Sequence, residues 1–444
     1  MLKKDAGKEF KKVTETKVKP ETERKKSKKN KLIDIINYLN EKYEFKYNLF
    51  AKKPVYRRVG ETNFEFLDER EFDNLYNEIE IDQGLVIPRT RLESLVGSNF
   101  ISEDFDPIKD YLKNLPVWDG KDRIRLFLQQ IQLKDESQRE FLITYFTKWF
   151  VAVIASLIDD FAINEMGLVF TGEQGRGKTR FFTSLIPAHL RLHYLFVGSF
   201  NPRDKDHLEM MGTKILIFLD ELETITRTDE ATLKSVMSLR HITLRRAFGR
   251  GNIHLHRRAS FAGSINDAKF LTDQSGNRRW LPFAIHDIQI DEGFCIDDLY
   301  AQALALWKNR YNIWFDRQEI EVINDHNEDF RRKPMEEDLV MLHYAIPKKD
   351  EIESNHSSLE YLTTTDLMHE IASKDSYRKM NTNDTVLKRI GKSLEKLGFQ
   401  KVKKRVEGYA NPREVWVVKP LGIEDINRIK RGNDMIPDNE RFEM

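Results

Sequence analysis

The chain has 444 residues, and its 73 Lys and Arg nearly cancel its 72 Asp and Glu, so the net charge of +1 does not by itself indicate an acidic partner. The single cysteine, Cys295, excludes an intramolecular disulfide and a cysteine-based zinc site, and it fits a reducing compartment. The most apolar run, residues 149–158, is about half as long as the ~20 residues that a membrane helix needs. We therefore expect a soluble cytoplasmic protein of about two to four domains, without a membrane partner.

The N-terminal part of the chain contains two segments of different composition. Residues 1–31 carry thirteen Lys or Arg against five acidic residues, which predicts a disordered basic tail that either solubilises the protein or contacts nucleic acid. Residues 32–98 combine a helical pattern at 32–40 with alternating apolar residues at 42–50 and 63–68, which predicts a small α+β module. Its aromatic residues favour a half-buried sheet face, with base stacking as the alternative.

A helical segment, residues 99–160, is expected next. Asp106 and Pro107 are typical of a helix start, and residues 115–131 predict a turn followed by an amphipathic helix. Within residues 161–315, apolar strands alternate with helical patterns, which predicts an α/β core built on a largely parallel sheet.

The loop at residues 172–179 matches G-x-x-x-x-G-K-[ST], which predicts a P-loop that binds the phosphates of ATP. An apolar strand precedes the loop and a helical pattern follows it, so that backbone N–H groups and the helix N-terminus can surround the anion. We expect Lys178 to reach the β- and γ-phosphates and the Thr179 hydroxyl to ligate Mg²⁺. The residues expected to bind the nucleotide are Gly172, Glu173, Gln174, Gly175, Arg176, Gly177, Lys178 and Thr179.

Polar residues follow the later strands of this core. Asp220 and Glu221 come directly after an apolar strand and predict a Mg²⁺ ligand and a general base for the attacking water. Asn266 ends the next strand, either as a sensor of the γ-phosphate and the water or as a turn residue. Arg278 and Arg279 precede another strand, either as a surface pair or as an arginine finger that stabilises the transition state in its own site or in a neighbour's.

A basic β-hairpin is predicted at residues 241–258, between the acidic pair and the strand that ends in Asn266. Two alternating stretches flank a glycine-rich turn at 249–252, and the whole segment lacks acidic residues. This pattern favours contact with a phosphodiester backbone over a solvated loop, and its histidines lack a third ligand for a metal site. The expected contacts are Arg245, Arg246, Arg250, His254, Arg257 and Arg258.

Residues 316–420 predict helices followed by a β-hairpin, and residues 421–444 a tail. The helix at 383–399 has an apolar face and a basic face. With a preceding helix at 363–373 and two strands within 401–419, it predicts a winged-helix-like domain that contacts either DNA or another protein. The basic residues expected to contact DNA are Lys388, Arg389 and Lys392.

Several stretches, in this order, resemble the virulence-associated protein E family, ATPases related to superfamily-3 helicases of phages, plasmids and genomic islands. The resemblance covers residues 106–315 and rests on DPIKDYLKNLPVWDGKDRI, GEQGRGKT, IFLDELE, LRRAFGR, LTDQSGNRRWLP and LYAQALALW. It implies an ATP-dependent DNA helicase or helicase-like replication ATPase that works as a homo-oligomeric ring, such as a hexamer. Many relatives carry a fused primase, but this chain lacks a zinc ligand set, so a separate primase or another replication protein is the expected partner.

Two other functions stay open on the sequence. An ATP-switched replication initiator would bind DNA through the same residues without unwinding it. A small-molecule P-loop kinase would need neither Glu221, which is placed to activate water, nor a basic hairpin. The predicted fold is α/β: a P-loop (AAA+-like) core with a parallel sheet, using Mg²⁺ and ATP, joined to a small α+β module, a helical linker domain and a winged-helix-like domain.

Overall fold

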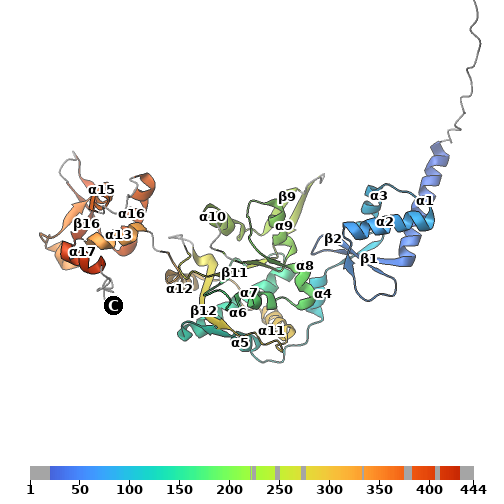
Figure 1. Cartoon of the computed structure of the whole chain (residues 1–444), viewed down its shortest axis with the longest axis horizontal. Helices are drawn as coiled ribbons and strands as arrows, with labels where there is room; N and C mark the ends of the chain where they lie inside the picture. The colour runs from blue at the N-terminus through green and yellow to red at the C-terminus, as the bar shows by residue number, and fades with distance from the viewer. Residues whose placement is uncertain are drawn as a thin grey trace, which may run out of the picture. The chain divides into compact units, whose positions relative to one another are not determined.

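The computed structural model describes residues 21–220, 222, 227–245, 251–271, 277–332, 335–374, 383–405 and 411–430. The protein is a mixed α/β structure whose strands form several sheets (Figure 1). The chain divides into two compact units. Unit 1 comprises Met1–Ala268 and Arg278–Glu321, and unit 2 comprises Lys269–Asn277 and Val322–Met444.

Unit 1 begins with a sheet of order β3-β2-β1-β4, in which β1 is antiparallel to β2 and parallel to β4. Tyr43 and Phe45 of β1 are buried against the helices of this module, so they form a core face rather than a base-stacking surface. Helix α1 begins within the segment that we expected to be a basic tail, and β4 extends the sheet beyond residue 98. The bounds are α1 Glu21–Lys42, β1 Tyr43–Asn48, β2 Lys53–Arg58, β3 Glu65–Phe66, α2 Glu69–Gln83, α3 Arg89–Val96 and β4 Ser102–Phe105.

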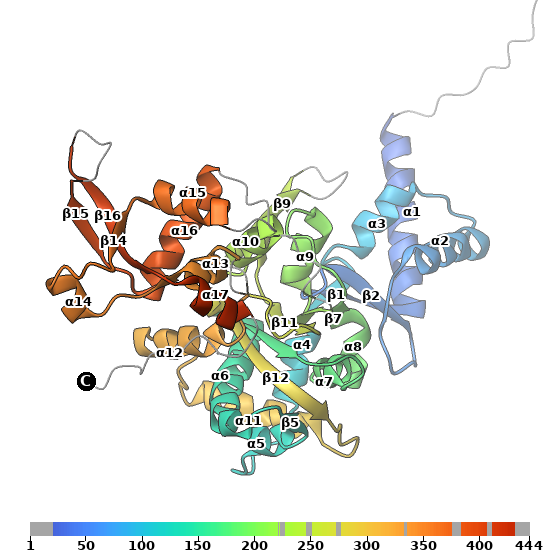
Figure 2. The ribbon, with the colours of Figure 1, turned by 60° about the vertical axis from the view of Figure 1, so that its left-hand side comes forward.

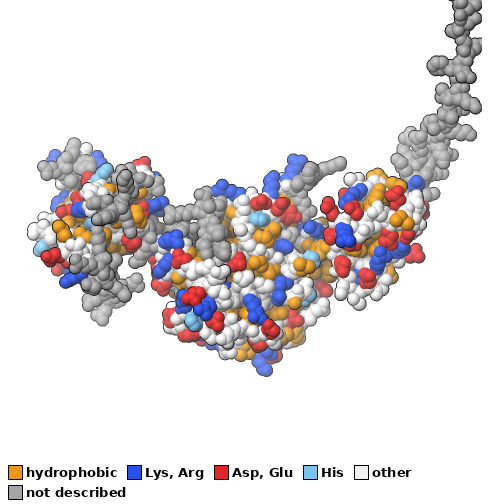
Figure 3. Space-filling view, viewed as in Figure 1, with side chains coloured by type: hydrophobic (Ala, Val, Ile, Leu, Met, Phe, Trp, Pro, Cys, Tyr) orange, Lys and Arg blue, Asp and Glu red, His pale blue; other side chains and the backbone are white. Residues whose placement is uncertain are grey.

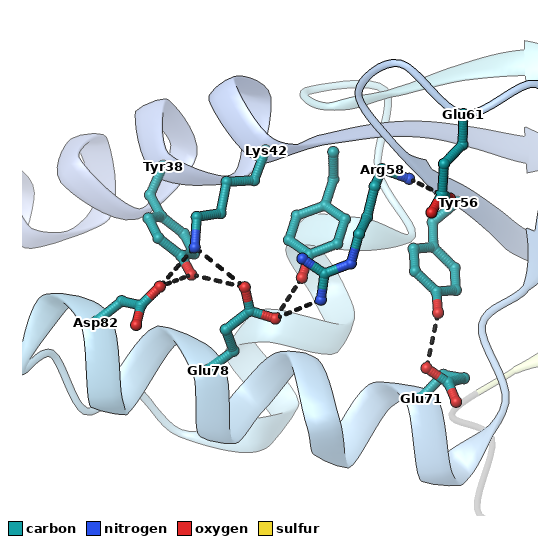
Figure 4. Close-up of polar contacts among 9 residues, drawn as sticks. Tyr38, Lys42, Tyr56, Arg58, Glu61, Glu71, Glu78 and Asp82 are labelled. Carbon is teal, nitrogen blue, oxygen red and sulfur yellow. Dashed lines mark hydrogen bonds and ion pairs between the residues drawn. The ribbon is translucent and has the colours of Figure 1, made fainter.

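Glu78 on α2 joins the helices of this module to its sheet (Figure 4). Its carboxylate accepts hydrogen bonds from the Tyr43 hydroxyl at 2.5 Å, from Lys42 Nζ at 3.1 Å and from Arg58 Nη2 at 3.0 Å. Burial alone would raise the pKa of Glu78, but these hydrogen bonds lower it below its usual value. The ionised carboxylate therefore stabilises the folded module.

We expect Glu78→Gln to destabilise this module by about 1.5–3 kcal/mol at pH 7, because a neutral amide replaces the acceptor of charge-assisted hydrogen bonds. Hydrogen exchange of the amides of α2, β1 and β2 in the full chain measures the effect, with the exposed Glu80→Gln as the matched control. Since the pKa of Glu78 is lowered from 4.5, its contribution is complete above pH 4.5 and is lost as the pH falls through the lowered value. Equal exchange in the two variants at pH 7, or a difference that persists below the lowered pKa of Glu78, would contradict this role.

The following segment is mainly helical, as predicted. Asp106 caps α4 by accepting hydrogen bonds from two backbone N–H groups of its first turn. The helical segment Glu136–Ile158 is long and apolar enough to cross a membrane, and it is longer than the apolar run, residues 149–158, seen in the sequence. However, 78% of its most apolar 18-residue stretch is buried inside the protein. The bounds are α4 Pro107–Lys113, α5 Arg123–Leu128, β5 Ile131–Leu133, η1 Glu136–Gln138 and α6 Arg139–Ile158.

The central sheet has the strand order β5-β12-β6-β11-β8-β7. All of its pairings are parallel except that of β5 with β12, as the alternation of strands and helices predicted. The bounds are β6 Gly167–Thr171, α7 Lys178–Ser184, α8 Ala188–Tyr194, β7 Leu195–Val197, α9 Lys205–Thr213, β8 Leu216–Leu219, α10 Arg227–Val236, β9 His241–Arg245, β10 Asn252–His256, β11 Ser260–Ile265, η3 Asn277–Arg279, β12 Trp280–Ile288 and α11 Ile296–Lys308.

Aromatic packing fixes α7 against this sheet. The rings of Phe181 and Phe182 lie 5.1 and 4.7 Å from that of Phe170 on β6, between centroids. Phe182 also stacks on Phe218 of β8 at 4.9 Å. The N-terminus of α7 is thereby held at the end of β6, where the glycine-containing loop enters it.

In unit 2, β15 pairs antiparallel with β16 after two helices, as the sequence predicted. The sheet order is β13-β16-β14, and β15 also pairs with β16. Helix α17 lies in the segment expected to be a tail. The bounds are α12 Arg317–Glu328, α13 Met335–His343, β13 Tyr344–Ala345, α14 Lys349–Glu353, β14 Glu360–Leu362, α15 Thr364–Lys374, α16 Asp384–Leu397, β15 Lys401–Lys404, β16 Arg413–Pro420 and α17 Ile423–Lys430.

The segment between Asn266 and Arg278 belongs largely to unit 2. Leu271 is fully buried and forms a parallel bridge with Arg331. Its backbone N–H donates to the carbonyl oxygen of Phe330 at 3.1 Å. The chain thus leaves unit 1 shortly after Asn266 and returns to it at Arg278, a connection that the sequence did not indicate.

Candidate functional site

The loop between β6 and α7 depends on glycine for its shape. Gly172, Gly175 and Gly177 have φ angles of 151°, 81° and 78°, which residues with side chains rarely adopt. A Cβ atom at Gly172 would lie 2.5 Å from the carbonyl oxygen of Ile285, and one at Gly177 would lie 2.9 Å from that of Ile288, whereas Gly175 faces open space. Strand β12 therefore packs so closely against the loop that only glycine fits at two of these positions.

We expect Gly172→Ala to destabilise the protein by about 2–5 kcal/mol, because it adds overpacking against a backbone carbonyl to the cost of a left-handed residue. Gly175→Ala is the matched control, since it adds only the backbone strain of about 1–2 kcal/mol. Thermal unfolding of the full chain measures both, with the larger drop in Tm expected for Gly172→Ala. Equal drops would show that β12 does not confine the loop.

Lys178 lies inside the loop that precedes it. Its side chain is buried, and Nζ donates hydrogen bonds to the carbonyl oxygens of Gly172 and Glu173 at 2.5 and 2.8 Å. The same Nζ lies 3.5 Å from Oδ1 of Asn266, at the end of β11. The structure thus brings together the lysine of the loop and the asparagine that the sequence predicted as a sensor.

Asp220 follows β8 and lies close to the start of α7. Its Oδ1 is 3.5 Å from the Thr179 hydroxyl and accepts a hydrogen bond from the Ser264 hydroxyl at 2.6 Å. Thr179 and Asp220 were predicted as metal ligands, whereas Ser264 was not predicted. The parallel register accounts for its position: Gly263 pairs with Leu219, so the residues that follow them, Ser264 and Asp220, lie side by side at the carboxyl end of β8.

These residues line one cavity of about 330 Å³, formed by residues 174–180, Asp220 and residues 264–266. This volume lies within the range of roughly 300–1,000 Å³ that is usual for small-molecule sites. Glu173 and Arg176 form an ion pair at 2.5 Å, and Arg176 lowers the pKa of the Glu173 carboxyl below its usual value. Glu221, the predicted general base, lies outside the described residues.

Thr179 and Asp220 fit a magnesium ion. Mg²⁺ is usually bound by one or two carboxylates, with substrate phosphates and water completing its coordination. One carboxylate and one hydroxyl, close together at the end of the loop, match that requirement. Among the residues that the structure describes, no group of three His, Cys, Asp or Glu side chains is placed to hold a metal ion without such a substrate.

Residues 112–332 match the family model described as virulence-associated protein E-like domain. They are a virulence-associated protein E-like domain. The domain contains every residue that lines the cavity. It also includes Arg331, whose backbone forms the bridge with Leu271.

No curated protein matches the chain. Among solved structures, the apo structure of the NrS-1 C terminal region (305-718) is 12% identical, covers 88% of this chain and 100% of its own, and has a TM-score of 0.44. The A form apo structure of the same region is also 12% identical, covers 87% of this chain and 98% of its own, and has a TM-score of 0.43. A likeness at this level does not establish a common fold.

Arg278 and Arg279 of the virulence-associated protein E-like domain lie in η3, at the start of β12. The Arg279 guanidinium donates two hydrogen bonds, at 3.1 and 2.8 Å, to the hydroxyl of Ser238, which follows α10. The side chain of Arg278 is exposed. Of the two, Arg279 supports the packing of its own chain, and Arg278 is accessible to another molecule.

The predicted basic hairpin of this domain consists of β9 and β10, which extend from the central sheet beside α9 (Figures 1 and 2). Arg245 ends β9 and is exposed. His254 on β10 is exposed, and its Nδ1 lies 2.9 Å from the Thr243 hydroxyl. Arg246 and Arg250 lie outside the described residues.

Two other arginines of the hairpin require a correction, because they are held within unit 1. Arg257 is only 2% exposed, and its guanidinium donates to the carbonyl oxygen of Asn164 at 2.5 Å. Burial lowers the pKa of Arg257 to about 10. Arg258 lies over the ring of Phe50 and pairs with Asp106 at 3.4 Å. Both side chains therefore attach the base of the hairpin to Asn164, Phe50 and Asp106 of unit 1. They are not available to contact DNA.

The basic face of α16 is only partly available. Lys388 and Lys392 are exposed and one helical turn apart. Arg389, also predicted as a DNA contact, forms an ion pair with the buried Glu336 at 3.2 Å. Its charge is therefore matched within unit 2, which leaves the two lysines as the stronger candidates.

Proposed function

We propose that this chain is an ATP-dependent DNA helicase or helicase-like replication ATPase of a mobile element. The observation that carries the proposal is the convergence on one cavity, beside a glycine-dependent loop, of Lys178 at the start of α7 with Asp220 and Asn266 at the ends of β8 and β11. The family resemblance of residues 112–332 supports the same function.

In this proposal, Lys178, Thr179, Asp220 and Asn266 at the cavity act together with Glu221 in hydrolysis. Nζ of Lys178 would exchange its hydrogen bonds to the carbonyl oxygens of the loop for contacts with the β- and γ-phosphates. Backbone N–H groups of the loop would surround these phosphates. Thr179 and Asp220 would hold Mg²⁺, which neutralises phosphate charge when it is bound. Asn266 would orient the attacking water, and Glu221 would accept its proton as the terminal phosphate leaves ADP.

The order of the strands supports an AAA+-like P-loop core. Strand β6, which leads into the loop, lies between β11 and β12, and β11 separates it from β8. Because β6, β8 and β11 are mutually parallel, their carboxyl ends lie at one edge of the sheet, where open α/β sheets bind ligands.

We assign DNA binding to the hairpin and to α16, with α15, α16 and the β15–β16 hairpin as a winged-helix-like domain. On the face drawn in Figure 3, basic and acidic side chains are interspersed, so local basic clusters rather than net charge would attract a phosphodiester backbone. The proposed contacts are Arg245, Arg246, Arg250, His254, Lys388 and Lys392.

ATP hydrolysis with and without single-stranded DNA tests this proposal. We expect DNA to stimulate hydrolysis, and Arg245→Ala to weaken DNA binding without changing the basal rate, because Arg245 does not line the cavity. Loss of one phosphate contact reduces the slope of log K against log salt by about 0.7 for a single strand. Arg317→Ala is the matched control, since Arg317 is exposed and ion-paired with Glu321. Hydrolysis that is indifferent to every nucleic acid would contradict the proposal.

A second function, an ATP-switched replication initiator, would use the same cavity. The exposed Lys388 and Lys392 on α16 favour it, because a helix with a basic face suits the groove of duplex DNA. Strand displacement on a forked duplex separates the two functions. Displacement supports the helicase, whereas binding and hydrolysis without displacement support the initiator.

A further inference from the structure

We infer that Ser264 is a positioning residue, whose hydroxyl orients the Asp220 carboxylate toward Mg²⁺. This inference rests on the proposed function and adds a residue that acts through Asp220 rather than on the nucleotide. Its basis is a hydrogen bond of 2.6 Å from Ser264 Oγ to Asp220 Oδ1.

Ser264 has a rigid position from which to do this. It is 4% exposed and lies on β11, which is paired on one side with β8 and on the other with β6. Ser264 pairs with Phe170 of β6, and the preceding Gly263 pairs with Leu219 of β8, so this backbone cannot shift toward or away from Asp220 without disturbing the sheet. The hydroxyl therefore fixes the rotation of a carboxylate that would otherwise turn about its own side-chain bonds at the end of β8.

Thr179 and Ser264 both reach the same carboxylate oxygen, but at different distances. The Thr179 hydroxyl lies 3.5 Å from Asp220 Oδ1, at the limit of a hydrogen bond. The proposed function requires Thr179 to turn its oxygen toward Mg²⁺, so Ser264 is the donor that stays on Asp220 when the metal is bound. An ionised carboxylate accepts at both oxygens, so this hydrogen bond still leaves Asp220 able to bind the metal or its water.

A titration of Mg²⁺ in the presence of ADP, with nucleotide binding as the readout, tests the inference on the full chain. Partners that orient metal ligands typically contribute about 10–100-fold to metal affinity. We expect Ser264→Ala to raise the Mg²⁺ concentration that supports half-maximal binding by about 10–100-fold. Ser260→Ala is the matched control, because Ser260 is a buried serine of the same strand whose hydroxyl instead accepts a hydrogen bond from Asn164.

A double-mutant cycle with Asp220→Ala separates positioning from a general structural effect. If Ser264 acts through Asp220, Ser264→Ala has no further effect on the Mg²⁺ requirement in the Asp220→Ala background. Ser264→Thr, which keeps the hydroxyl, should bring the requirement back toward that of wild type. An unchanged requirement in Ser264→Ala, or the same loss in both backgrounds, overturns the inference alone. A wild-type chain without Mg²⁺-dependent nucleotide binding overturns both the inference and the proposed function.

Discussion

Lys178→Ala is expected to lower kcat for ATP hydrolysis by at least about 10²–10³-fold, because it removes a preorganised cation from the developing charge on the phosphates. Other cations near the cavity are already paired. Arg176 forms an ion pair with Glu173, and Arg180 forms one with Glu292. Neither can replace the Lys178 ammonium without giving up its own partner. Phosphate release at saturating ATP and Mg²⁺ measures the loss.

Lys308→Ala is the control for Lys178→Ala, because Lys308 is an exposed lysine in the last turn of α11. It should hydrolyse ATP like wild type. Both variants should unfold at temperatures close to that of the wild type, so that lost hydrolysis is not lost folding. Retention of wild-type hydrolysis by Lys178→Ala would mean that the glycine-containing loop does not hold the reacting phosphates.

Arg278→Ala is expected to lower hydrolysis by about 10³–10⁵-fold, the effect known for arginine fingers, while nucleotide binding is retained. Arg278 is exposed, as a finger that enters a neighbouring subunit must be. If it acts in a neighbour's site, mixing Arg278→Ala with Lys178→Ala restores part of the activity. This follows because an interface between the two variants can combine Lys178 of the Arg278→Ala chain with Arg278 of the Lys178→Ala chain, which gives one complete site.

Arg279→Ala provides the comparison for Arg278→Ala. Arg279 donates to Ser238 within its own subunit, so its removal should lower Tm by more than it lowers kcat. Mixing Arg279→Ala with Lys178→Ala should not restore activity beyond that of Arg279→Ala itself. Full activity of Arg278→Ala would show that Arg278 does not act at the site. Failure of the mixture of Arg278→Ala and Lys178→Ala to recover activity would exclude action between subunits.

The arrangement of elements and residues around the cavity that the sequence predicted has local physical causes. The strand, loop and helix around Gly172 and Lys178 follow from glycine spacing between two apolar segments, and the hairpin follows from alternation around a glycine-rich turn. Asp220 and Asn266 were found because each ends an apolar strand, and parallel strands bring such residues to one edge. The helix α16 follows from its apolar periodicity.

What the sequence could not predict depends on partners that are distant in the chain. Arg257 and Arg258 look like neighbouring arginines of a basic loop, but the carbonyl oxygen of Asn164 and the carboxylate of Asp106 hold them. Short strands such as β4 and β5 carry too few residues to show alternation and exist because of their pairing with β1 and β12. The bridge between Leu271 and Arg331 within unit 2 has the same origin.

Hydrogen exchange with a slowly hydrolysed ATP analogue and Mg²⁺ is the most direct measurement of the central claim. The claim is that the cavity at the carboxyl edge of the central sheet holds the nucleotide phosphates. It predicts that the analogue slows exchange in residues 172–180 and 264–266, and that this protection is lost in Lys178→Ala. An analogue that binds but protects other parts of the chain, or protection that persists in Lys178→Ala, would contradict it.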